Sequence, residues 1–207
     1  MAAGALGATA GVLLWLTLQP MAGLYFNGTV SLPTGLYHVR DVPVQVGDVV
    51  ATCLGEEASA LALARGYLGK GHCPHGTGPV GKVLAAIAGD TVTVTADGVW
   101  VGAHLLPNSA PLEKDSQGYT LPRIRGPRIL GAGEVWLYSG YHARSFDSRY
   151  FGPISASAIR GRAVPLWIWQ DPYDPRQALP PTDGRHRRLE QGDGHTGSAH
   201  QRSVPNW

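Results

Sequence analysis

The hydrophobic pattern of the chain begins with a long uncharged stretch. Residues 1–39 contain no Asp, Glu, Lys or Arg, and residues 2–26 are mostly apolar. A helix needs roughly 20 such residues to cross a bilayer. We therefore predict a transmembrane anchor or signal over residues 1–26; a cleaved secretory signal and a buried core helix are the alternatives to an anchor. An anchor or a signal would place the remaining chain outside the cytoplasm.

Short β-like runs follow this stretch, separated by residues that favour turns. A single helix is predicted over 56–67, where two glutamates precede a run of Ala and Leu and Gly66 ends the pattern. No βαβ alternation is present, so the pattern predicts a mainly β fold with one short helix. The β-like runs cover residues 35–39, 44–52, 78–106, 134–140 and 163–170.

Composition divides the chain into three parts. Residues 170–207 are rich in Pro, Gly, Arg and His and poor in core residues, which predicts a flexible C-terminal tail. Residues 27–169 would then form the folded domain, behind the segment at 1–26. The net charge of +2 is too small to argue for a nucleic-acid partner.

The chain has two cysteines, Cys53 and Cys73. An even number in an exported protein favours a disulfide. A metal site is the alternative, because His72 and His75 flank Cys73. Zinc requires four ligands at short spacings, and Cys53 has no such neighbour. We predict the disulfide, and neither a metal nor another cofactor.

Ser31 lies in a turn-prone segment just beyond the apolar stretch, where it would need a base to become a nucleophile. His38 and His142 do not lie in a recognisable triad setting. Lys82 lies in the apolar run VGKVLAAIAGD, so burial is expected on either strand face. Burial can lower a lysine pKa by 3 to 5 units, which makes the amine a usable base. The alternative is an edge-strand lysine that blocks aggregation.

Four segments occur in a fixed order behind the apolar stretch: SLPTGLY, VGDVV, KVLAAIAGD and SFDSRYFGPI. Together they resemble the serine/lysine signal peptidases, and most closely the TraF-type signal peptidases of conjugative transfer systems. The resemblance runs from about Asn27 to Trp169. It implies a signal-peptidase-like β fold. The chain departs from the family at Val83 and at residues 87–90, and neither departure removes a group that the chemistry needs.

The resemblance also implies roles for individual residues. Ser31 would be the nucleophile and Lys82 the general base. Thr29 would help the Ser31 N–H to hold the oxyanion, although a plain turn hydroxyl is the alternative. The Asn27-Gly28-Thr29 glycosylation sequon is set aside.

Three further roles are implied by the segment SFDSRYFGPI. Ser145 would orient the lysine amine. Asp147 and Arg149 would form a buried pair that braces the site, and a purely structural salt bridge is the alternative reading of this pair.

The resemblance implies a membrane-anchored serine endopeptidase that processes an exported precursor. The substrate would be a membrane-inserted conjugative prepilin, released by water or by its own amino terminus as a cyclic product. The membrane and other conjugative transfer proteins would be partners. The location would be the bacterial inner membrane, with the catalytic domain on the periplasmic side. The alternatives are a general leader peptidase and a non-catalytic periplasmic scaffold; the self-cleaving repressors are a weaker relative.

Overall fold

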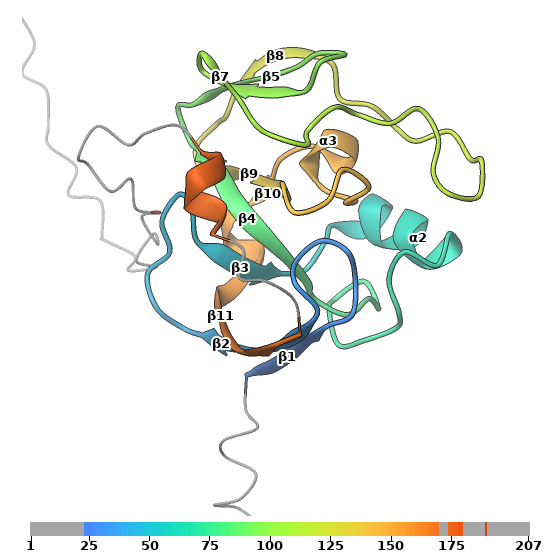
Figure 1. The fold of residues 1–207 in the computed structure, drawn as a ribbon, viewed down its shortest axis with the longest axis vertical. Helices are drawn as coiled ribbons and strands as arrows, with labels where there is room; N and C mark the ends of the chain where they lie inside the picture. The colour runs from blue at the N-terminus through green and yellow to red at the C-terminus, as the bar shows by residue number, and fades with distance from the viewer. Residues whose placement is uncertain (1–22, 170–173, 180–188, 190–207) are drawn as a thin grey trace, which may run out of the picture.

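The computed structural model describes residues 23–169, 174–179 and 189, and its ribbon is built from two antiparallel sheets (Figure 1). The larger sheet has seven strands in the order β1-β2-β11-β3-β4-β9-β10. Its strands are β1 (Leu24–Asn27), β2 (Gly35–Arg40), β3 (Val49–Thr52), β4 (Val80–Ile87), β9 (Glu134–Tyr138), β10 (Ile154–Ser155) and β11 (Ile159–Ile168).

The smaller sheet has four strands in the order β7-β6-β5-β8 and lies at the upper end of the ribbon (Figure 1). Turns at Gly89–Asp90 and Asp97–Gly98 lead into and out of β5, as the sequence predicted. The strands are β5 (Thr91–Val94), β6 (Val99–Val101), β7 (His104–Leu105) and β8 (Gly126–Ile129).

Strand β4 is the centre of the structure. Its residues from Val80 to Ala86 are all buried, because β3 pairs with it on one side and β9 on the other. The apolar run that suggested burial on either face is therefore buried on both. Leu84 packs with Leu137 in one core cluster, whereas Val83 packs with Trp136 in another.

The mainly β character is confirmed, but the expectation of one short helix is wrong. The predicted helix is α2, which spans Glu56–Ala64 and is shorter than the 56–67 pattern. A second helix, α3 (Ser148–Phe151), begins where the Asp147 side chain accepts the Arg149 N–H. Short 3₁₀ turns lie at η2 (Ala156–Ala158) and η3 (Pro175–Ala178). A four-residue helix leaves no periodic pattern to detect.

The structure differs from the predicted boundary at residue 26. Leu24–Asn27 form β1, which pairs with β2, so the strand begins inside the segment assigned to the membrane. Residues 1–22, on which the anchor prediction mainly depends, lie outside the described residues. No helix within the described ranges has the length and apolar character to cross a bilayer.

Parts of the predicted flexible tail pack against the domain. Leu179 and Leu189 are buried in the two main core clusters. The Arg176 side chain donates to the buried carboxylate of Asp48 at 2.9 Å. Isolated apolar residues in a Pro- and Gly-rich segment carry no periodic signal, so the sequence did not predict this packing. The rest of 170–207 lies outside the described residues.

The predicted disulfide is confirmed. Cys53 follows β3 directly and is bonded to Cys73, which lies in the loop that leads into β4. Both cysteines are 6% exposed. The bond therefore joins the end of β3 to the loop that precedes β4, the strand of Lys82, and closes the segment that contains α2.

Replacing both cysteines by serine should lower the free energy of unfolding by about 3 kcal/mol, given the sequence separation of 20 residues. The chain-entropy model attributes this loss to the freer unfolded chain. Urea unfolding of the full chain in detergent, with and without reductant, measures it. Reductant should destabilise the native protein and leave the doubly substituted one unchanged. Equal stability of the two oxidised proteins would contradict the prediction.

Candidate active site

The turn between β1 and β2 carries Ser31 to the middle of the sheet. Ser31 is 7% exposed, and the following Leu32 packs directly on Gly81 of β4. A Cβ on Gly81 would lie 2.6 Å from Leu32 Cδ1 and 3.2 Å from the Tyr25 ring. The glycine beside Lys82 is thus what allows the turn to approach the strand.

Lys82 and Ser31 are in direct contact. Lys82 Nζ donates a hydrogen bond to Ser31 Oγ at 2.5 Å, across 51 residues of sequence. Lys82 is 2% exposed, and its strand has a neighbour on each side. The edge-strand alternative is therefore wrong: this lysine does not protect a sheet edge.

Burial lowers the pKa of Lys82 to about 8. Desolvation is the main cause. The two charged neighbours act in opposite directions, because Asp147 raises this pKa and Arg149 lowers it. A lysine with this pKa is neutral in about one molecule in ten at pH 7, far more often than an exposed lysine. The amine can therefore accept a proton near neutral pH.

Two serines, one of them not foreseen, surround Ser31. Ser145 Oγ donates to Ser31 Oγ at 3.2 Å, so its hydrogen bond is to the hydroxyl rather than to the lysine amine expected from the resemblance. Ser139 Oγ donates to the main-chain oxygen of Ser31. Ser139 lies directly after β9, and a serine there gave no sequence signal.

Thr29 also lies beside Ser31. Its Oγ1 accepts the Ser31 N–H at 3.4 Å and donates to Asn27 Oδ1 at 2.9 Å. The two groups expected to hold an oxyanion are thus side by side on the turn. The predicted Ser31, Lys82, Thr29 and Ser145 are brought together in one place.

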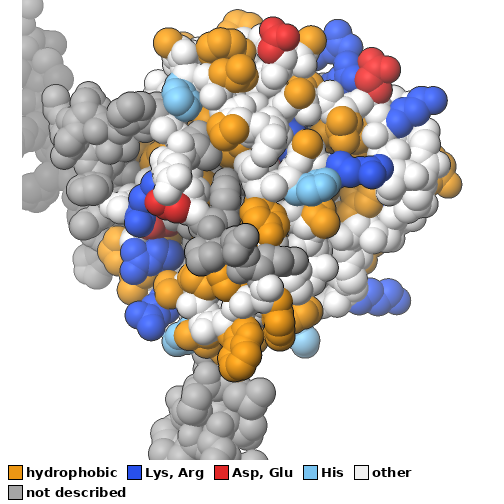
Figure 2. All heavy atoms as spheres, in the orientation of Figure 1, with side chains coloured by type: hydrophobic (Ala, Val, Ile, Leu, Met, Phe, Trp, Pro, Cys, Tyr) orange, Lys and Arg blue, Asp and Glu red, His pale blue; other side chains and the backbone are white. Residues whose placement is uncertain are grey.

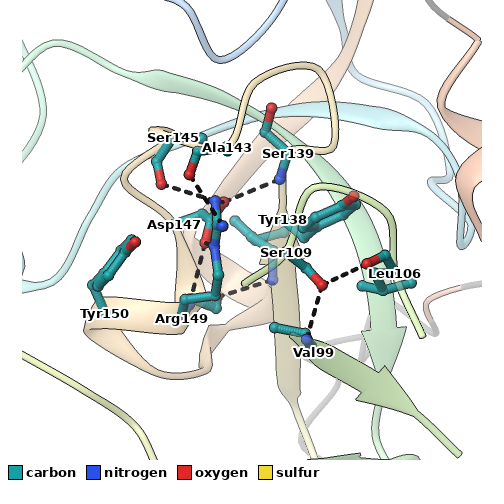
Figure 3. Close-up of polar contacts among 12 residues, drawn as sticks. Val99, Leu106, Ser109, Tyr138, Ser139, Ala143, Ser145, Asp147, Arg149 and Tyr150 are labelled. Atoms are coloured by element: carbon teal, nitrogen blue, oxygen red, sulfur yellow. Dashed lines mark hydrogen bonds and ion pairs between the residues drawn. The ribbon is translucent and has the colours of Figure 1, made fainter. Parts of the chain in front are cut away.

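Asp147 and Arg149 form a buried ion pair behind the site (Figure 3). Both side chains are fully buried, and Arg149 donates from Nε and Nη2 to the two carboxylate oxygens at 2.8 and 2.9 Å. Asp147 Oδ2 also accepts the Ser139 N–H at 3.1 Å. Arg149 further binds main-chain oxygens of Asn108, Ala110, Ala143 and Ser145.

The pair therefore connects two loops. Its main-chain partners lie in the segment after β7 and in the single loop between β9 and α3. Ser145 is held through its carbonyl, 3.0 Å from Arg149 Nη2. The ion pair thus contacts the main chain of the residue whose hydroxyl meets Ser31.

A cleft of about 650 Å³ opens over the two reactive groups. Ser31 and Lys82 lie in its wall together with Tyr25, Phe146 and Tyr150. Its volume is in the range of ligand pockets in proteins. Among the described residues, no three or more His, Cys, Asp or Glu side chains cluster so that they could hold a metal ion.

An exposed aromatic edge lies near this cleft. Hydrophobic side chains gather at the lower end of the face in Figure 2, over the end of the sheet formed by β1, β2 and β11. Phe26, Trp167 and Trp169 are 59%, 66% and 62% exposed, and the rings of Phe26 and Trp169 are 6.1 Å apart. Exposed apolar patches of this kind mark contact surfaces.

Comparison with known sequences identifies relatives over most of the chain. Residues 7–169 match the family described as signal peptidase, peptidase S26. A plasmid transfer protein TraF of Escherichia coli is 41% identical over 82% of this chain and 96% of its own length. A conjugal transfer protein TraF of Agrobacterium fabrum (strain C58 / ATCC 33970) is 36% identical over 79% of this chain and 94% of its own length.

Among solved structures, a signal peptidase I from Enterococcus faecalis V583 aligns with 59% of this chain and 97% of its own length. The sequence identity is 21% and the TM-score 0.34.

Replacing Lys82 by methionine should stabilise the protein most at neutral pH. The folded pKa of about 8 lies below the ordinary value of 10.5, so the unfolded chain binds more protons between these values. Wild-type stability should therefore rise with pH across this window, by up to about 3 kcal/mol. Lys82→Met lacks this rise, so the difference in free energy of unfolding between the two proteins should shrink as the pH rises. Urea unfolding of both proteins from pH 7 to 10.5 measures this difference. Parallel curves would show that the lysine is not desolvated.

Replacing Arg149 by methionine should lower the free energy of unfolding by about 3 to 5 kcal/mol, because Asp147 would keep a buried, uncompensated charge. The matched control is Arg128→Met, which breaks the Arg128–Glu134 pair at 47% and 32% side-chain exposure. Exposed pairs contribute less than about 1 kcal/mol. Urea unfolding compares the two variants, and similar losses would contradict the structural role of the buried pair.

Proposed function

The chain belongs to the S26 signal peptidase family, and from this membership we propose that it is a membrane-anchored serine endopeptidase with a Ser31–Lys82 dyad. The observation that carries the proposal is the 2.5 Å contact between Lys82 Nζ and Ser31 Oγ in a buried setting. A nucleophile and its base must be within hydrogen-bond reach, and the base must be able to lose its charge.

In the proposed reaction, neutral Lys82 removes the proton of Ser31 as Oγ attacks the scissile carbonyl carbon. The negative charge that develops on the carbonyl oxygen is held by the Ser31 N–H and the Thr29 hydroxyl, which must first leave the partners they have in this structure, Thr29 Oγ1 and Asn27 Oδ1. The tetrahedral intermediate then collapses, and the leaving amine takes the proton from Lys82. An ester to Ser31 remains, which water or an amine of the substrate resolves to restore the free hydroxyl.

The Ser145 hydroxyl supports the proposal because it donates to Ser31 Oγ, the oxygen that Lys82 Nζ also contacts, at 3.2 Å. Two donors on one oxygen restrict where it can lie. The Asp147–Arg149 pair would keep Ser145 in place through its carbonyl. Ser145 is thus proposed to position the nucleophile itself.

We propose a conjugative prepilin as the substrate, since TraF transfer proteins are close relatives over most of the chain. The exposed aromatic edge supports an active site near the membrane, where Trp side chains prefer to lie. The uncharged segment that precedes β1 would tether the domain there. Processing on the periplasmic side of a bacterial inner membrane, beside other transfer proteins, fits these features.

Ser31→Ala and Lys82→Ala should each reduce prepilin processing about 1,000-fold or more, because the dyad members act as a unit. The full chain is expressed in cells with the prepilin, and the precursor-to-product ratio is followed by mass spectrometry. Ser157→Ala, at an exposed serine in η2, is the control and should process normally. Wild-type processing by both dyad variants would instead favour a non-catalytic scaffold.

The same assay with assorted exported precursors tests the substrate. Preference for the prepilin supports dedicated processing. Comparable cleavage of the whole set would favour a general leader peptidase.

A further inference from the structure

Asn27 is the last residue of β1, and its side chain is at the centre of the turn that carries Ser31. The residue is 1% exposed. Its Nδ2 donates to the main-chain oxygens of Leu32, Thr29 and Pro33, at 2.8, 3.0 and 3.3 Å. One amide group thus holds the carbonyls on both sides of Ser31.

The other end of the amide faces donors. Asn27 Oδ1 accepts the Thr29 hydroxyl at 2.9 Å, the Thr29 N–H at 3.4 Å and the Tyr25 hydroxyl at 3.4 Å. Acceptors surround Nδ2 and donors surround Oδ1, so the orientation of the amide is determined by its partners. No other side chain that is isosteric with asparagine offers both functions.

The contact to Tyr25 extends this arrangement to the strand of the base. The Tyr25 hydroxyl accepts the Gly81 N–H at 3.0 Å and donates to Asn27 Oδ1. Gly81 immediately precedes Lys82. A continuous chain of hydrogen bonds therefore runs from the base strand through Tyr25 and Asn27 to the nucleophile turn.

We propose that Asn27 is a positioning residue for the Ser31–Lys82 dyad and for Thr29. It holds the turn so that Ser31 Oγ stays within reach of Lys82 Nζ, and it orients the Thr29 hydroxyl beside the Ser31 N–H. The inference rests on the proposed peptidase function. Asn27 touches neither the reacting oxygen nor the amine, so it acts through its neighbours.

The burial of Asn27 also shows that the Asn27-Gly28-Thr29 sequon is not a glycosylation site in the folded protein. A glycan would have to be attached at Nδ2, which is engaged with three main-chain oxygens inside the turn. The folded protein therefore has no place for it. The same three-residue pattern serves to connect the asparagine amide with the threonine hydroxyl.

The test compares Asn27→Asp and Asn27→Ala with the wild-type full chain in detergent. Asn27→Asp keeps the size and the Oδ1 acceptor but turns an oxygen toward three carbonyls. Asn27→Ala removes the amide without adding a charge, and remains informative if the aspartate variant folds poorly. The expected result is a fall in kcat on the prepilin of about 100-fold, with KM changed less than about threefold.

A second measurement follows the turn itself, independent of activity. Hydrogen exchange by mass spectrometry should show faster exchange in residues 27–34, and little change in α2 or β9. Val92→Ala, in the buried core of the smaller sheet, is the stability control. It should lower the thermal midpoint by about as much as the Asn27 substitutions do, but keep kcat near the wild-type value.

The outcomes separate the inference from the proposed function. A wild-type kcat in both Asn27 variants, with processing intact, would overturn the positioning role while leaving the peptidase in place. A kcat loss equal to that of Val92→Ala would also overturn it, because destabilisation alone would explain the loss. If the wild-type protein does not process the prepilin, the proposed function fails. Unchanged hydrogen exchange at residues 27–34 in the Asn27 variants would show that Asn27 does not stabilise the turn.

Discussion

The structure depends on the burial of one lysine amine, at 2% exposure, in the wall of a cleft. Lys82 lies in the most buried strand of the larger sheet, 2.5 Å from the hydroxyl of Ser31. An ammonium group loses hydration there, and this loss is what lowers its pKa to about 8. The same burial that lowers this pKa makes the lysine unfavourable for folding in its charged form. The surrounding strands must offset that cost.

The fold supplies the burial and the contact by different means. Pairing with β3 and β9 closes both edges of β4, and the packing of Leu32 on Gly81 brings the Ser31 turn against this strand. The Asp147–Arg149 pair then holds the Ser145 segment against the same hydroxyl. Ion pairs this deeply buried add little net stability, because the desolvation of the two charges offsets their attraction.

Much of the fold was predictable from local patterns. The runs that became β2, β3, β4, β9 and β11 alternate or are continuously apolar, and α2 has acidic residues at its start and a glycine past its end. Strand β1 was hidden because its residues continue an apolar stretch, and α3 is too short to show a period. Leu179 and Leu189 were assigned to a flexible tail, since single apolar residues among Pro and Gly do not reveal what they pack against.

From the sequence alone came the disulfide and the order of four segments, which residue type and spacing indicate, and the candidate dyad, which the resemblance carried by those segments implies. Only the tertiary structure decided that Lys82 is in a central strand, that Ser145 meets the serine and not the lysine, and that Asn27 and Ser139 donate hydrogen bonds to the turn that carries Ser31. These facts join residues separated by up to 114 positions. Hydrogen-bond partners at such separations depend on which strands become neighbours, and the local pattern of one strand does not encode its neighbours in the sheet.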